Sequence, residues 1–143
     1  MGLLPRGTIL TIRWKSSYSV GVSVMDNEHR SLFNVMHELD NALAAGSGQL
    51  VIDTVLAKVT NWAEQHFTHE EELMLENGFP GYEAHRAEHD QARRQLETYE
   101  HDRKAGKQGV PVSLLLFLDS WLRQHILKID LQYAGYLNQR GIR

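Results

Sequence analysis

The chain has 143 residues, of which 42% are hydrophobic and 23% are charged, so it can form one folded domain with an apolar core. The net charge of −3 gives no reason to expect nucleic acid or a membrane surface as a partner. The chain has no cysteine, which excludes disulfides, iron–sulfur clusters and thiolate zinc sites.

The first residues resemble neither a signal peptide nor a membrane span. Met1 to Leu10 lacks a long apolar core, and no apolar run in the chain approaches the ~20 residues of a spanning helix. We therefore expect a cytoplasmic protein without membrane contact. Residues 1–12 are expected to be a linker or arm, and residues 13–143 one domain in which Trp14 packs on the core.

Two helices are predicted in the first half of the chain. The first should begin near Asp26, a good N-cap residue, and end in the run from Gly46 to Gly48. The second should run from about Leu50 to Asn77, because apolar residues recur there at helical spacing and Gly78 follows them.

Two further helices are predicted in the second half. One spans about Tyr82 to Lys104, and the other opens at Pro111 and continues through Tyr133. Short loops make neighbouring helices antiparallel. The sequence therefore predicts an all-α, up-down-up-down four-helix bundle with an N-terminal arm.

Each predicted helix carries histidine or carboxylate side chains on its apolar face. Unpaired ionisable groups in a bundle core are costly, and a metal site would remove that cost. Imidazole with carboxylate suits iron, zinc, manganese or copper. The candidate ligands are His29, His66, Glu70, His85, His89, His125 and Asp130.

The number of these ligands indicates two metal ions. Zinc prefers about four ligands, whereas two octahedral ions sharing both carboxylates and one bridging oxygen would use all seven residues and leave one position open. An open position suits a small ligand such as dioxygen. The set is rich in neutral imidazole and lacks the paired Glu-x-x-His motifs of oxidising di-iron bundles. A ligand set with more neutral imidazoles than carboxylates favours reversible binding of dioxygen over its activation.

The last two candidates have irregular spacing. His125 and Asp130 are five residues apart, which on a regular helix separates them by about 140°. We expect either a local widening of the helix, as in a π-bulge, or a cluster that lies between the two directions.

These motifs resemble the hemerythrin family, in its bacterial oxygen-binding branch, over nearly the whole chain after about residue 12. All seven candidate ligands match the family at its spacing. The matching segments are Trp14 with Val20-Gly21-Val22, Met25-Asp26-Asn27-Glu28-His29, His66-Phe67-Thr68-His69-Glu70-Glu71, His85 to His89, and Trp121-Leu122-Arg123-Gln124-His125 to Asp130.

The resemblance implies a di-iron centre with oxo or hydroxo bridging. His85, His89 and His125 would hold one iron, His29 and His66 the other, and Glu70 and Asp130 would bridge them. Dioxygen would bind at the iron of His29 and His66, in an apolar pocket that slows autoxidation. The expected lining residues are Phe33, Phe67, Trp121, Leu122, Ile126 and Leu127.

Several other polar residues are expected to stay outside this site. His37, His69 and His101 are predicted to face solvent, and Glu71 and Glu72 to lie on a solvated helix face. Tyr133 could donate a hydrogen bond to a ligand, although an ordinary core position is the favoured interpretation.

Four functions are compatible with this pattern. The leading one is a dioxygen carrier or store, and the alternative is an oxygen or redox sensor domain from a larger signalling protein such as a chemoreceptor. An enzyme acting on peroxide or nitric oxide is weaker, because no acid or base is clearly placed beside the cluster. Iron storage is weaker still, because no acidic mineral-nucleating surface is visible.

Overall fold

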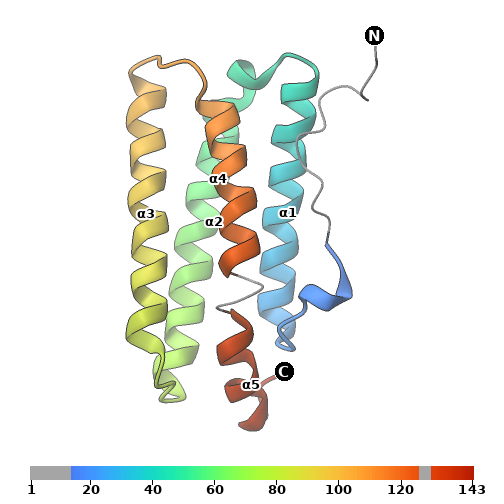
Figure 1. The fold of residues 1–143 in the computed structure, drawn as a ribbon, viewed down its shortest axis with the longest axis vertical. Coiled ribbons are helices and arrows are strands. Elements are labelled where there is room, and N and C mark those ends of the chain that lie inside the picture. Colours follow the sequence, from blue (N-terminus) through green and yellow to red (C-terminus); the bar gives the residue numbers. More distant parts are fainter. Residues whose placement is uncertain (1–13, 126–129) are drawn as a thin grey trace.

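The computed structural model describes residues 14–125 and 130–143, and within them it contains helices and no strand. Four long helices lie side by side, and a short fifth helix lies beyond the end of α4 (Figure 1). The elements are the 3-10 helix η1 (Ser16–Tyr18), α1 (Ser23–Ala44), α2 (Gly48–Glu76), α3 (Tyr82–Lys104), α4 (Val110–Gln124) and α5 (Leu131–Gln139). The predicted all-α antiparallel bundle is confirmed.

Local signals end the long helices where the sequence predicts. Gly46 and Gly78 adopt left-handed backbone angles, with φ of 74° and 62°, two positions after the last residues of α1 and α2. The Phe79 N–H then reaches back to the Met74 carbonyl oxygen at 2.9 Å, which satisfies one of the last free carbonyls of α2. Helix α3 has the predicted bounds, Tyr82–Lys104.

Helix α1 begins earlier than predicted, at Ser23, and Asp26 lies in its first turn instead of capping it. The Asp26 carboxylate is buried and accepts hydrogen bonds from the Val20 N–H at 2.8 Å and from the Ser19 hydroxyl at 2.5 Å. Asp26 therefore fixes the segment before the helix, a role that capping statistics do not reveal. Helix α2 also begins two residues early, at Gly48.

The predicted fourth helix corresponds to two described elements, and residues 126–129 between them lie outside the described residues. Helix α4 ends at Gln124 and α5 begins at Leu131, with the predicted irregular step from His125 to Asp130 between them. His125 and Asp130 are both π-helical, which agrees with the expected local widening at their five-residue spacing. His125, next to the end of α4, and Asp130, next to the start of α5, are both buried.

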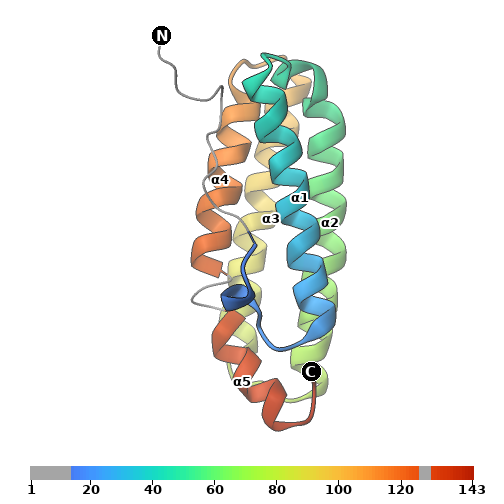
Figure 2. The ribbon, with the colours of Figure 1, turned by 90° about the vertical axis from the view of Figure 1, so that its right-hand side faces the viewer.

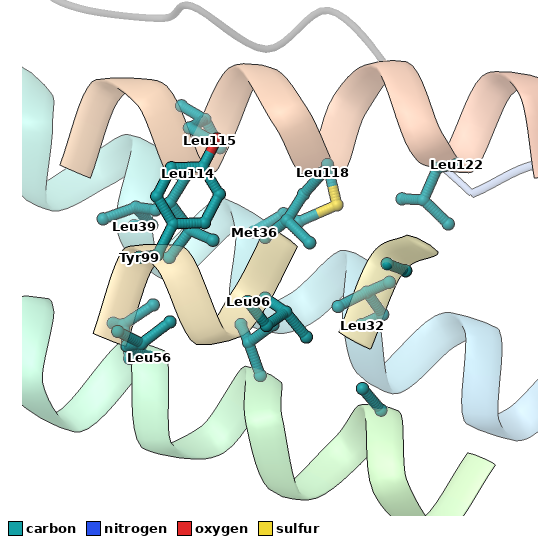
Figure 3. Close-up of a cluster of buried hydrophobic side chains, with 14 of the residues drawn as sticks. Leu32, Met36, Leu39, Leu56, Leu96, Tyr99, Leu114, Leu115, Leu118 and Leu122 are labelled. Atoms are coloured by element: carbon teal, nitrogen blue, oxygen red, sulfur yellow. The ribbon is translucent and has the colours of Figure 1, made fainter. Parts of the chain in front are cut away.

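Two apolar clusters fill the bundle. The larger draws on α1 to α4, and Figure 3 shows leucines of these helices meeting around Met36 and Tyr99. The smaller joins α5 to the segment before α1, and its buried members are Val20, Val22, Met25, Met74, Tyr133, Ala134 and Leu137. On α1, His29 lies between Met25 of one cluster and Leu32 of the other. The candidate ligands thus lie between the two clusters.

The N-terminal arm, defined here as residues 14–22, lies along α1 (Figure 2). The rings of Trp14 and Phe33 meet edge to face with centroids 5.9 Å apart, and Tyr18 stacks on Phe33. Trp14 is therefore a packing residue, as predicted. Within the described ranges, every helix is too short or too polar to cross a membrane.

Candidate metal centre

The seven predicted ligands come together in the middle of the bundle, and each is at most 3% exposed. Helix α1 contributes His29, α2 contributes two residues, α3 contributes two, and the junction of α4 and α5 contributes the last two. They form two groups, and within each group all ligand atoms lie within 4.8 Å of one another. One group is Glu70, His85, His89 and His125, and the other is His29, His66, Glu70 and Asp130.

Glu70 belongs to both groups because its two oxygens contact different imidazoles. Oε1 lies 2.6 Å from His85 Nε2 and 3.0 Å from His89 Nε2. Oε2 lies 3.1 Å from His66 Nε2. A carboxylate that offers one oxygen to each group has the arrangement needed to bridge two cations.

The two oxygens of Asp130 also contact different imidazoles. Its Oδ1 lies 2.8 Å from His125 Nε2 and 3.2 Å from His85 Nε2. Its Oδ2 lies 3.2 Å from His29 Nε2. Both carboxylates therefore connect a group of three imidazoles with a group of two.

Several of these buried atoms have no hydrogen-bond partner among the described residues. They are the Nδ1 and Nε2 atoms of His29, Nε2 of His66, Nδ1 of His125 and both oxygens of Asp130. A buried polar atom without a hydrogen bond costs about 1–3 kcal/mol. Among the described residues, the contacts of His29 Nε2, His66 Nε2 and the Asp130 oxygens are imidazole–carboxylate ion pairs within the cluster, so this part of the interior suits a cation. Imidazole and carboxylate donors in this number fit a pair of iron ions.

The carboxylates also change the acid–base properties of the histidines. Burial lowers the pKa of His66, but the charge of Glu70 and the hydrogen bond to Glu28 outweigh it and raise that pKa to about 9. Burial acts likewise on His85 and His125, and contacts with Asp130 and Glu70 raise each pKa to about 9. A pKa of about 9 favours the protonated form of these three imidazoles at neutral pH.

Glu28 supports His66 from outside the cluster, a role that the sequence pattern did not predict. The outer nitrogen of His66, Nδ1, lies 2.6 Å from Glu28 Oε1. The second oxygen of Glu28 lies 2.9 Å from His69 Nδ1. The side chain of His69 is 39% exposed, so it faces solvent in part, as predicted, but it also anchors Glu28.

Glu71 plays the corresponding part for His89, so its predicted solvated position was wrong. Its side chain is only 13% exposed, and its Oε2 accepts a hydrogen bond from His89 Nδ1 at 2.7 Å. Burial raises the pKa of Glu71, but hydrogen bonding to His89 and the nearby Arg93 charge lower it overall. Glu72 is exposed, as predicted.

Tyr133 is fully buried and is more than the ordinary core tyrosine that was the favoured interpretation. Its hydroxyl donates a hydrogen bond to Glu70 Oε2 at 2.8 Å. Burial and the charges of Glu70 and Asp130 raise the pKa of Tyr133, so it stays a donor. Of the other two histidines expected at the surface, His101 is exposed and His37 is half-buried.

Two of the three aromatic residues expected around an open iron stack on candidate ligand imidazoles. Phe67 stacks on His89 with ring centroids 4.1 Å apart, and Trp121 stacks on His125 at 4.3 Å. Leu122 is buried, and Phe33 packs on Trp14 and Tyr18. The two other predicted lining residues, Ile126 and Leu127, lie outside the described residues. A ligand pocket lined by these side chains stays a prediction.

Neighbouring sequence offered only a weak signal for the outer glutamates. Glu28 directly precedes His29, and Glu71 directly follows Glu70, yet each supports a histidine of another helix. Glu28 and His66 are 38 residues apart in the chain, and Glu71 and His89 are 18 apart. Helical periodicity describes one helix at a time and does not report such pairs.

Comparisons with known proteins agree with this geometry. Residues 20–137 match the family model described as the hemerythrin HHE cation binding domain. Bacteriohemerythrin of Clostridium acetobutylicum is 27% identical over 125 residues, covering 84% of this chain and 96% of that protein. Hemerythrin subunit 2 of Golfingia vulgaris is 30% identical, covering 85% and 90% of the two chains.

The fold agrees as well. A crystal structure of wild-type hemerythrin superposes with a TM-score of 0.80 at 26% identity, covering 88% of this chain and 97% of that one. The family match spans both apolar clusters and all seven buried ligand candidates. The chain belongs to the hemerythrin family.

Proposed function

We propose that the seven buried residues hold two iron ions and that the protein binds dioxygen reversibly, as a carrier or store. The observation that carries this proposal is the split of each carboxylate between two groups of imidazoles. His85, His89 and His125 would hold one iron, and His29 and His66 the other. Glu70 and Asp130 would bridge them.

The iron pair would supply the electrons and the open coordination position for dioxygen. The chain supplies the surroundings. Tyr133 holds Glu70 in its bridging orientation through the hydrogen bond to Oε2. Phe67 and Leu122 are each 1% exposed and keep water from the cluster, which favours slow autoxidation.

The visible spectrum of the iron-loaded, reduced protein tests this function. We expect two irons per chain, a colourless reduced form, a stable pink-violet band in air, and bleaching under argon. Immediate conversion to a yellow ferric form would argue against a carrier.

Removing one ligand tests which iron is open. His66→Ala should abolish dioxygen binding and leave the helical circular dichroism largely intact, because the two apolar clusters do not include His66. His101→Ala removes an exposed imidazole from α3 and serves as the matched control. Retained dioxygen binding in His66→Ala would refute the assignment.

A series of contacts from Glu70 to the arm favours a second candidate function, that of an oxygen or redox sensor. Tyr133 touches Glu70 and packs in the same apolar cluster as Val20 and Val22 of the arm. A change at the bridging carboxylate therefore has a direct route to the arm. A sensor predicts fast autoxidation and different amide exchange in residues 19–22 of the diferrous and diferric forms, whereas a carrier predicts neither.

A further inference from the structure

Arg93 lies on α3, one turn after the candidate ligand His89, at the edge of a groove of about 660 Å³ between α2 and α3. Its side chain is 23% exposed. Neither the metal cluster nor the apolar clusters include it, so its role is not explained by the proposed function.

The guanidinium of Arg93 contacts both groups that hold His89 from outside. Its Nη2 lies 3.1 Å from Glu71 Oε2, the same oxygen that accepts the hydrogen bond from His89 Nδ1. Its central carbon lies 5.2 Å from the ring centroid of Phe67, which stacks on the His89 imidazole with an interplanar angle of 8°. Arg93 thus contacts Glu71, which binds the outer ring nitrogen of His89, and Phe67, which stacks on the face of the same ring.

Arg93 is itself fixed in place. Nη1 donates a hydrogen bond to Asp90 Oδ1 at 2.8 Å, and Nε lies 3.9 Å from Glu64 Oε2. Three carboxylates around one planar guanidinium restrict its rotamers. The glutamate on the other side of the cluster differs, because Glu28 is anchored by His69 and not by a permanent charge.

Groups that hold the outer nitrogen of a metal-binding histidine fix its tautomer and ring orientation, and their loss commonly weakens metal binding by about 10–100-fold. We propose that Arg93 is a positioning residue that orients His89 through Glu71 and Phe67 and so sets the affinity of the iron held by His85, His89 and His125. The proposal rests on the di-iron function proposed above.

The test measures the Fe²⁺ affinity of the whole chain by competition with a chelator. Arg93→Gln should lower the affinity for one of the two iron ions by about 10-fold. Arg93→Lys keeps the charge and should retain most of the affinity that Arg93→Gln loses. Arg103→Gln is the matched control, because Arg103 is also on α3, is also 23% exposed, and pairs with Glu100 and Asp53 away from the cluster. It should leave both affinities unchanged.

A double variant separates positioning from a general effect of charge. Because Arg93 acts through both Glu71 and Phe67, Arg93→Gln should cause a smaller loss of affinity in the Glu71→Gln background, where only the Phe67 contact remains, than in the unaltered protein. Equal affinities in Arg93→Gln and Arg103→Gln, or the same loss from Arg93→Gln in both Glu71 backgrounds, would overturn the inference. Failure of the unaltered protein to bind iron would instead refute the proposed function, and this inference with it.

Discussion

At the scale of single residues, the buried cluster depends on side chains that are not candidate ligands. Glu28 and Glu71 hold the outer nitrogens of His66 and His89, and Tyr133 holds one oxygen of Glu70. These contacts fix the directions in which imidazole and carboxylate lone pairs point. Contacts of this kind lower the cost of ordering a site on binding.

Tyr133→Phe tests this support with the loss of one oxygen atom. The variant keeps the ring but removes the donor to Glu70, and a hydrogen bond to a charged group contributes about 1.5–3 kcal/mol. We expect the free energy of unfolding of the metal-free protein, measured with urea, to fall by that amount.

Tyr136→Phe is the comparison, because the Tyr136 hydroxyl donates to backbone carbonyls of Asn77 and Gly78 near the surface. Its cost should be smaller, about 0.5–1.5 kcal/mol. A larger loss in Tyr136→Phe than in Tyr133→Phe would contradict the supporting role of Tyr133.

At the scale of elements, α5 connects the cluster to the N-terminal arm. The Asn138 amide donates to the Gly21 carbonyl oxygen at 2.9 Å and to the Ile142 carbonyl oxygen at 2.7 Å. Gly21 has φ of 72°, and a Cβ added there would lie 2.7 Å from Asn138 Oδ1. The close approach of arm and helix thus requires glycine for two reasons.

Gly21→Ala and Gly46→Ala form a matched pair that measures this contact. Both glycines are left-handed, with φ of 72° and 74°, but a Cβ at Gly46 meets nothing within 4 Å. Each variant should lose roughly 1–2 kcal/mol of unfolding free energy from backbone strain. Gly21→Ala should lose about 1 kcal/mol more, because Asn138 must move and give up a hydrogen bond.

The extra loss should disappear when both glycine variants are made in an Asn138→Ala background, where no side chain obstructs the new methyl group. Urea unfolding of the four proteins measures it. An extra loss that persists without Asn138 would mean that the arm is held by other contacts.

At the scale of the whole molecule, a charged cluster lies between two apolar ones, and this arrangement makes stability depend on what occupies the cluster. In the metal-free protein, His66, His85 and His125 each have a pKa raised to about 9 from the usual 6.5, chiefly by Glu70 and Asp130 acting against burial. Protonated histidines then replace a metal as the counter-charge.

The stability of the metal-free protein should consequently fall at high pH. A raised pKa in the folded state contributes stability that is fully present below pH 6.5 and is lost as pH rises through about 9. Urea unfolding of the metal-free protein should show a lower midpoint at pH 9.5 than at pH 6.5. A midpoint that is constant or rises over this interval would contradict the charge balance described here.

The sequence by itself determined the helices whose limits are set by neighbouring residues, and which residues could serve as ligands. Helix α3 has its predicted bounds because Pro80 and Gly81 precede it and Gly106 follows it, all within a few positions. His85 and His89 share a face because one turn of helix separates them. Periodicity of this kind is local and can be read along one chain segment.

Only the tertiary structure decided which groups meet across helices. The pairs Glu28 with His66 and Glu71 with His89 join different helices, and the division of α4 from α5 lies where His125 and Asp130 both turn into the cluster. Asp26 likewise binds the arm instead of capping α1. These features depend on distances between segments that periodicity leaves free, because a helix can rotate and slide until packing and buried charge fix it.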